Sequence, residues 1–209
     1  FWGTRGSIAT PGPGTNHFGG NTSCVELTTA NGDLLIFDCG TGARRLAAEL
    51  MAQGKKAINS NILLGHTHWD HIQGFPFFSP AFVKGNSVAI YGPEGSRGSL
   101  HDVLAGQMEF TYHDLTEGIH TIGGARVATQ FLHHPAMTVG YRVEADGVAV
   151  VYLVDHEPFS DELWRAGAEP GRIESILHDG DRRHAKFMAD ADLVIHDAQY
   201  TPEEYGAKK

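Results

Sequence analysis

The residues best suited to chemistry are three histidines and an aspartate within one hexapeptide, HTHWDH, at residues 66–71. They follow a glycine and the apolar run Ile62–Leu64, so they lie at the mouth of a strand that we expect to be buried. Burial of these groups in a dry core is unfavourable, because each loses its hydrogen bonds to water without an assured partner. A metal ion binds them all, whereas the alternative is a histidine-rich surface loop that does nothing.

The spacing within the hexapeptide separates its members into two groups. In an extended segment His66 and His68 point to the same side, so both can reach one cation. Asp70 and His71 are offset from that pair as the chain tightens into a turn, and they suit a neighbouring cation. Imidazole with carboxylate fits zinc, manganese or iron, whereas calcium and magnesium prefer oxygen ligands alone.

The size and charge of the chain limit its class. A chain of 209 residues fits one domain, which we expect to span residues 1–209, and can bury roughly 70% of its unfolded surface. The net charge of −9 and the lack of a basic run argue against a nucleic-acid partner and favour a small substrate.

Cysteine usage and hydropathy indicate the compartment. Cys24 and Cys39 form no CxxC motif, and no secretory segment opens the chain, although it begins at Phe1 and a short leader is left open. No apolar stretch approaches the roughly 20 residues that span a bilayer. We therefore expect a reduced, cytoplasmic protein without membrane contact.

Hydrophobic patterning gives the elements that must position the hexapeptide. Asn31-Gly32 between two apolar runs is a strong hairpin signal. Asp38 follows the second run, and we prefer to assign it to capping the next helix. The elements expected in the first half are strands at 25–28, 34–37, 62–64 and 88–91, helices at 43–53 and 100–108, and an aromatic segment at 75–82 that packs as core or lines a pocket.

The second half reads as an antiparallel meander, because Gly123-Gly124 and Asp146-Gly147 separate apolar runs. The elements expected there are strands at 119–122, 125–132, 139–144, 148–154 and 193–195, and a helix at 161–168. His134 and Asp155 lie where strands end, so they can converge with distant residues. Two β-rich halves with helices between and after them predict an α+β fold of two sheets packed face to face, with helices outside, in four layers.

Six histidines and aspartates now stand just after apolar strand patterns: His66, His68, Asp70, His71, His134 and Asp155. Their order resembles the metallo-β-lactamase superfamily, whose pattern is HxHxDH followed by a histidine, an aspartate and a final histidine. The resemblance covers nearly the whole chain and implies an αβ/βα sandwich of two mixed sheets. The stretches FWGTRGS, GGNTSC, LHHPAMTVGYR, YLVDHEP and ADLVIHDAQYT resemble the phosphodiesterase branch, which includes phosphoribosyl cyclic phosphodiesterases and the RNase Z-like tRNA 3′-processing endonuclease.

The resemblance implies two divalent metal ions, zinc first, with manganese or iron as alternatives. The implied ligands are His66, His68 and His134 for one ion, Asp70 and His71 for the other, and Asp155 between them. His134 is preferred to His133 because the family places its ligand directly before proline. The family's final histidine is absent before Lys209, so the chain has lost its C-terminal end or the second site is one ligand short.

Further residues receive roles with alternatives. Asp70 or Asp155 would orient the attacking water or accept its proton. His196 resembles a proton donor near the leaving group, with a substitute ligand or a structural residue as alternatives. Asp38 and Asp197 are candidates to hold the ligand imidazoles, since such rings need an acceptor for the second nitrogen.

The expected function is a metal-dependent hydrolase, a phosphodiesterase that cleaves a small cyclic phosphodiester with a metal-activated hydroxide. A lactone or thioester hydrolase of the same fold is one alternative, and a non-catalytic metal- or ligand-sensing domain with an incomplete second site is another. RNA processing would require an added substrate-binding arm, which the sequence does not reveal. The candidate residues for the pocket walls are Trp69, Phe75, Phe77 and Tyr112. The sequence does not decide the oligomeric state, and a homodimer is one possibility.

Overall fold

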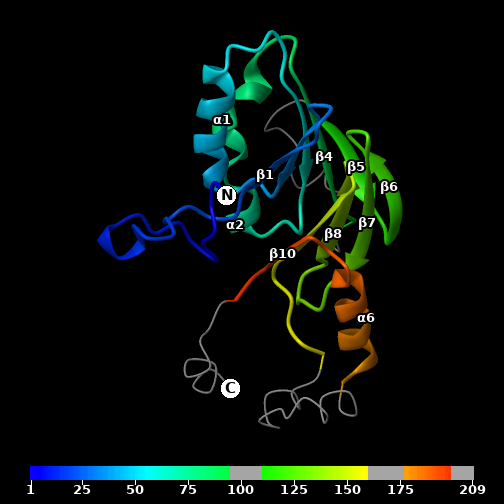
Figure 1. Ribbon diagram of the computed structural model, residues 1–209. Coiled ribbons are helices and arrows are strands. Elements are labelled where there is room, and N and C mark those ends of the chain that lie inside the picture. The colour runs from blue at the N-terminus through cyan, green and yellow to red at the C-terminus, as the bar shows by residue number, and fades with distance from the viewer. Residues whose placement is uncertain (95–109, 160–176, 199–209) are drawn as a thin grey trace.

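Two five-stranded β-sheets form the centre of the fold in the computed structural model, which describes residues 1–94, 110–159 and 177–198 (Figure 1). The first sheet has the order β1-β2-β3-β4-β5 and the second the order β10-β9-β8-β7-β6. The strands of the first sheet are β1 (Val25–Thr28), β2 (Leu34–Phe37), β3 (Asn59–Leu63), β4 (Ser87–Pro93) and β5 (Thr111–Leu115). Those of the second sheet are β6 (Gly118–Ile122), β7 (Ala125–Phe131), β8 (Val139–Ala145), β9 (Val148–Leu153) and β10 (Leu193–His196).

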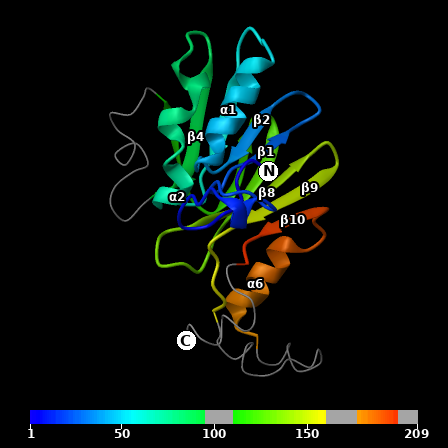
Figure 2. The same cartoon turned by 90° about the vertical axis from the view of Figure 1, so that its left-hand side faces the viewer.

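Helices cover the outer faces of both sheets, as Figures 1 and 2 show for the two longest described ones. Helix α1 (Gly42–Ala52) packs on the first sheet, and α6 (Asp179–Met188) packs on the second. The short elements are α2 (Trp69–Ile72) and the 3-10 turns η1 (Pro13–Thr15), η2 (Phe75–Phe77) and η3 (Ser79–Phe82). The predicted four-layer sandwich of two mixed sheets is therefore confirmed.

The side-chain alternation of β2 shows how the sequence makes the layers. Leu34 and Ile36 pack with the helix layer of α1, whereas Leu35 and Phe37 face the second sheet. Successive side chains of a strand point to opposite faces, so an unbroken apolar strand must be covered on both sides. The sequence LLIF of β2 meets that demand, and all four residues are buried.

Most strands expected from the patterning are present. The hairpin around Asn31-Gly32 pairs Val25 with Phe37, and the meander β6-β7-β8-β9 is antiparallel as predicted. Strand β5 and helix α6 were not predicted from the sequence. The helices expected at 100–108 and 161–168 lie outside the described residues.

Two further observations concern the cysteines and the helices. Cys24 and Cys39 are buried and form no disulfide. Among the described helices, none combines the length and the apolar character that crossing a bilayer requires.

Gly74 marks a close approach between the turn after α2 and the backbone that follows β2. Its N–H donates to the carbonyl oxygen of Cys39, and a Cβ at this position would overlap the carbonyl oxygens of Cys39 and Gly40. We expect Gly74→Ala to lower the free energy of unfolding by about 1–3 kcal/mol in urea denaturation, the cost of overpacking. The matched control is Gly14→Ala, where an added Cβ meets nothing within 4 Å. Equal stability of the two variants would contradict this assignment.

Candidate metal centre

The hexapeptide leaves the first sheet at the end of β3 and is fixed there by both sheets. The Gly65 N–H donates to Asp38 Oδ1 at 2.8 Å, and the Gly65 carbonyl accepts the N–H of Val139 at the start of β8. The Tyr141 hydroxyl, also on β8, donates to the carbonyl oxygen of Leu64. Residues 66–68 are therefore presented at the junction of the two sheets, and Asp70 and His71 follow on α2.

Four side chains converge at this junction, and their nearest ligand atoms all lie within 4.8 Å of one another. They are His66, His68, His134 and Asp155. His66 Nε2 lies 3.3 Å and His134 Nε2 lies 3.7 Å from Asp155 Oδ2, and His134 Nε2 lies 3.4 Å from His68 Nδ1. This is the one such group among residues 1–94, 110–159 and 177–198.

Asp70 and His71 form a second group that shares Asp155 with the first. His71 Nε2 lies 3.4 Å from Asp70 Oδ2 and 3.6 Å from Asp155 Oδ2. The His71 ring also lies against that of His66, with centroids 4.3 Å apart. All six side chains named from the sequence therefore lie close together at the junction.

Loop geometry brings His134 and Asp155 to the cluster from the second sheet. His134 lies between β7 and β8, and Asp155 follows β9 with a left-handed backbone, φ 57°. Aspartate tolerates this region better than most residues, so the chain can turn sharply at the end of the strand. The N–H of Glu157 donates to the carbonyl of His133, which ties the two loops together.

Asp38 contacts the nitrogen of the His71 ring that faces away from the cluster. Its side chain is fully buried, and its Oδ2 lies 2.7 Å from His71 Nδ1. The hydroxyls of Tyr152 and Ser23 donate to the same oxygen. The prediction that Asp38 caps the following helix is wrong, because α1 begins after Thr41 without a side-chain cap and the Asp38 carboxylate points into the site instead.

The charges around His71 favour a cation. Burial alone would lower the pKa of His71, but the carboxylates of Asp38, Asp155 and Asp70 raise it to about 12. Burial would raise the pKa of Asp38, yet His71 and the hydrogen bonds from His71, Tyr152 and Gly65 hold it below its usual value. Three carboxylates thus converge on one imidazole, and this surplus of negative charge suits a divalent ion.

His66 provides the direct test of whether an ion fits. The residue is fully buried, and neither ring nitrogen forms a hydrogen bond, although Nε2 lies 3.3 Å from Asp155 Oδ2. Burial and the neighbouring His71 lower its pKa to about 3, so the ring is neutral and can offer a lone pair. Leaving a buried polar group unsatisfied costs about 1–3 kcal/mol. A metal ion would satisfy it, and the donor set of imidazoles with carboxylates fits zinc, manganese or iron.

His196 lies outside the four-residue group. Its Nε2 lies 3.2 Å from His184 Nε2 on α6, and its Nδ1 lies 2.9 Å from the carbonyl oxygen of Asp197. The His184 ring stacks on that of His156, with centroids 3.7 Å apart. The candidate proton donor is therefore part of a separate group of histidines between α6 and the ends of β9 and β10.

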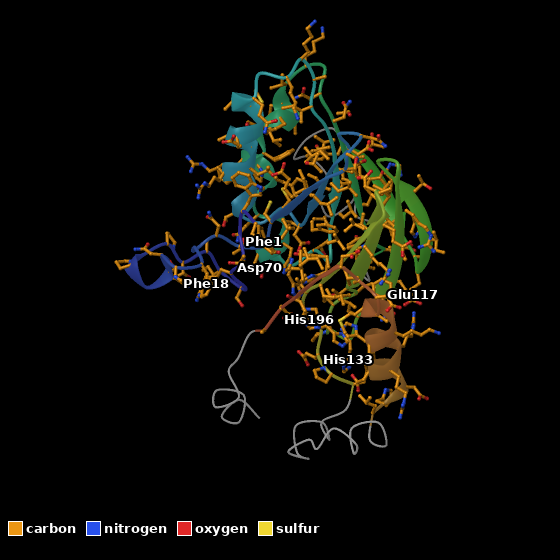
Figure 3. The ribbon with its side chains drawn as sticks, viewed as in Figure 1. Phe1, Phe18, Asp70, Glu117, His133 and His196 are labelled. Atoms are coloured by element: carbon orange, nitrogen blue, oxygen red, sulfur yellow. The ribbon has the colours of Figure 1, made fainter. Side chains whose placement is uncertain are left out.

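His133 differs from its neighbour His134. It is exposed, its Nδ1 lies 3.1 Å from the carbonyl oxygen of Glu157, and its ring stacks on Phe159. It is absent from the four-residue group. In the view of Figure 3, His133 is labelled below His196, and Asp70 is labelled above both.

Supporting residues were missed in the sequence. Tyr152 and Ser23 bond to Asp38, and the Ser7 N–H donates to Asp70 Oδ2 at 2.8 Å. The position of Asp38 gave a usable signal, because it follows an apolar strand just as the hexapeptide and Asp155 do. Backbone donors such as Ser7 leave no signal in the sequence.

The four residues named as candidate pocket walls differ in the exposure of their side chains. Phe75 is fully buried in the core next to α1, whereas Trp69 is 78% exposed and Phe77 is 58% exposed. Tyr112 lies on β5, where it packs against the same core. Of these four, Trp69 and Phe77 are accessible to a substrate.

Comparisons with known proteins agree with this geometry. A family model described as a beta-lactamase superfamily domain matches residues 34–207. A ribonuclease Z from Haloferax volcanii is 28% identical over 247 residues, covering 98% of this chain and 73% of the relative.

Two solved structures share the fold. The metallo-β-lactamase fold protein YhfI from Bacillus subtilis matches with a TM-score of 0.60 at 19% identity, covering 92% of this chain and 68% of YhfI. The short form of human tRNase Z matches with a TM-score of 0.50 at 17% identity, covering 94% of this chain and 90% of that protein.

The expectation that nucleic acid is not a partner is wrong, because curated relatives that match nearly the whole chain are ribonucleases. The expectation relied on the net charge of −9, which averages over the whole surface. Binding of a phosphodiester depends on the charges close to the bound strand.

Proposed function

We propose that this chain, which belongs to the metallo-β-lactamase superfamily, is a metal-dependent hydrolase that cleaves phosphodiester bonds in RNA. The observation that carries this proposal is the convergence of His66, His68, His134 and Asp155 at the sheet junction. The ribonuclease Z relatives support RNA as the substrate class. This substrate replaces the small cyclic phosphodiester expected from the sequence.

The proposed ligands follow the two groups at the junction: His66, His68 and His134 for one ion, Asp70 and His71 for a second, and Asp155 for both. When bound, such ions supply Lewis acidity at the phosphoryl group and make water acidic enough to be a nucleophile near neutral pH. Zinc is the ion that we propose, with manganese and iron as alternatives.

The chain's own residues orient the reacting groups. Asp38 fixes the His71 ring through Nδ1, so that Nε2 faces the cluster. Burial would raise the pKa of Asp70, but hydrogen bonds from His71 and the Ser7 N–H hold it below its usual value. Asp70 is therefore ionised, and we assign it to orienting the attacking water, since its lowered pKa makes it a weak acceptor for the proton of that water.

His196 is proposed as the donor of a proton to the leaving oxygen. Its Nε2 faces His184 in the described arrangement, so this role requires the ring to turn toward the cluster. Loss of His196 should then slow substrates with poor leaving groups more than an activated nitrophenyl ester, which leaves without a proton.

Metal removal tests the proposal. We expect the zinc-loaded chain to cleave single-stranded RNA and bis(p-nitrophenyl) phosphate, and chelation to lower both rates at least about 100-fold because the ions supply several kcal/mol. Zinc should restore the rates, whereas calcium should not, since it prefers oxygen ligands. Rates are measured by gel electrophoresis of labelled RNA and by nitrophenolate absorbance.

Two outcomes would contradict the proposal. RNA cleavage that survives chelation would indicate a contaminating ribonuclease or a mechanism without metal. Turnover of a lactone or thioester without turnover of either phosphodiester would place the chain among the other hydrolases of this fold.

A further inference from the structure

The most exposed apolar side chains are concentrated in the N-terminal segment that hydrogen-bonds to Asp70 and at Trp69, next to Asp70 in the sequence. Among the large hydrophobic residues of the described chain, the four most exposed are Phe18 at 81%, Trp69 at 78%, Phe1 at 70% and Ile8 at 66%. Three of them belong to residues 1–21, here called the N-terminal loop, and Trp69 directly precedes Asp70. Isolated exposed apolar residues are ordinary, but a concentration of them beside a site indicates binding.

The N-terminal loop is tied to the site and to itself. The N–H of Ser7 donates to Asp70 Oδ2 at 2.8 Å. Within the loop, Thr4 and Arg5 donate to the Asn21 carbonyl, and Thr10 donates to that of Gly20. Figures 1 and 3 show the loop projecting from the body of the molecule, with Phe18 on it and Asp70 at its base.

The charge of this segment differs from that of the rest of the chain. The first 25 residues contain no aspartate or glutamate, so all 25 acidic residues follow them. The loop also carries Arg5, which is exposed. An anionic strand near the metal centre would therefore meet less repulsion over this loop than over the acidic remainder of the chain.

Phe18 presents an exposed ring on a hydrogen-bonded backbone. His17 packs edge-on against it, with ring centroids 4.2 Å apart and an interplanar angle of 77°. The Phe18 carbonyl accepts a hydrogen bond from the Thr4 hydroxyl, which anchors the backbone. An exposed, anchored aromatic ring is a platform on which any nucleobase can stack.

We propose that the N-terminal loop binds the RNA strand that flanks the bond to be cleaved, with a base stacked on Phe18 and a phosphate facing Arg5. This inference rests on the proposed function, because it names how that site would take its substrate. It supplies the substrate-binding arm that the sequence did not reveal. The residues concerned are apart from the proposed ligands, so they can be changed without altering the ligand set.

The test measures binding and cleavage separately. Binding of a fluorescein-labelled single-stranded RNA to the metal-loaded chain is followed by fluorescence anisotropy on ice, before appreciable cleavage. We expect Phe18→Ala to raise Kd about 5- to 100-fold, the range of one lost base–aromatic stack, and Phe18→Trp to retain affinity. The matched control is Phe82→Ala, which removes an exposed phenylalanine from η3.

Arg5 provides a second, electrostatic readout. Arg5→Gln should reduce the slope of log Kd against log salt concentration by about 0.7, the value for one lost contact with a single strand. Arg44→Gln, at an exposed arginine on α1, is the matched control and should leave the slope unchanged. The ratio of kcat/KM for RNA to that for bis(p-nitrophenyl) phosphate should fall in Phe18→Ala but not in Phe82→Ala.

The outcomes separate the two proposals. If Phe18→Ala and Phe82→Ala bind RNA equally, the loop is not the binding surface, whether or not RNA is cleaved. If RNA binds through Phe18 but neither phosphodiester is hydrolysed, the proposed function fails and the binding surface stands. A Phe18→Ala change that turns a dimer into a monomer in sedimentation, without loss of RNA affinity, would overturn the inference in favour of an interface between copies.

Discussion

Replacing His134 with alanine should lower kcat/KM for RNA cleavage about 1,000-fold, whereas replacing its neighbour His133 should change it by less than about threefold. His134 Nε2 lies 3.4 Å from His68 Nδ1 and 3.7 Å from Asp155 Oδ2, so its loss removes one of the four groups that converge there. A displaced or missing ion would forfeit roughly 4 kcal/mol of transition-state stabilisation, which corresponds to the expected factor.

The pair of variants makes this comparison sharp. His133 and His134 share a loop and a residue type, but His133 contacts the Glu157 carbonyl and Phe159 instead of the cluster. Metal content by mass spectrometry should fall in His134→Ala and stay unchanged in His133→Ala, with similar free energies of unfolding in the metal-free state. Equal loss of activity in both variants would remove His134 from the proposed ligand set.

The candidate site was predictable because its chemistry conflicts with packing. Histidines and aspartates after apolar strand patterns have no simple structural use, and six of these positions lie close together at the sheet junction, although His133 and His196 make other contacts. The hairpin around Asn31-Gly32 was equally predictable from the sequence, since turn residues between apolar runs fix both the pairing and the register of the two strands.

The missed elements have weak local patterns for physical reasons. Strand β5 has the sequence TYHDL at the edge of its sheet, and only Leu115 is fully buried. Helix α6 is rich in charged residues, and its buried side chains are the polar Asp181 and His184. Its apolar contacts with the second sheet come from Phe187 and Met188, which are only partly buried. Elements with so little buried apolar surface depend on tertiary contacts that a sequence pattern does not record.

The net charge led to the wrong prediction about a nucleic-acid partner for a similar reason. A value of −9 describes the sum over the chain, but the first 25 residues contribute no acid to it. Charge distribution, and not the total, decides whether a polyanion can approach a site. The distribution becomes meaningful only when the N-terminal loop is seen tethered to Asp70 through Ser7.

Asp38→Ala should reduce the free energy of unfolding by about 3–5 kcal/mol, because it removes one partner from a buried ionic pair. The variant leaves the Nδ1 of His71, the N–H of Gly65 and the hydroxyl of Tyr152 without their acceptor. It should also weaken zinc binding about 10- to 100-fold, since the His71 ring loses the contact that orients it. Urea denaturation and zinc titration against a competing chelator measure the two effects.

Asp146→Ala is the matched control, because it separates the lost contacts from the backbone cost. Asp38 and Asp146 both occupy the left-handed region, with φ values of 57° and 55°, so alanine meets the same penalty of about 1–2 kcal/mol at either position. Asp146 is exposed and accepts one hydrogen bond, from the N–H of Ala30. Its variant should therefore lose little stability beyond that penalty and no zinc affinity. If the two variants were equally stable and bound zinc equally well, Asp38 would be a turn residue, and the contacts with His66, Asp70 and Asp155 would suffice to position His71.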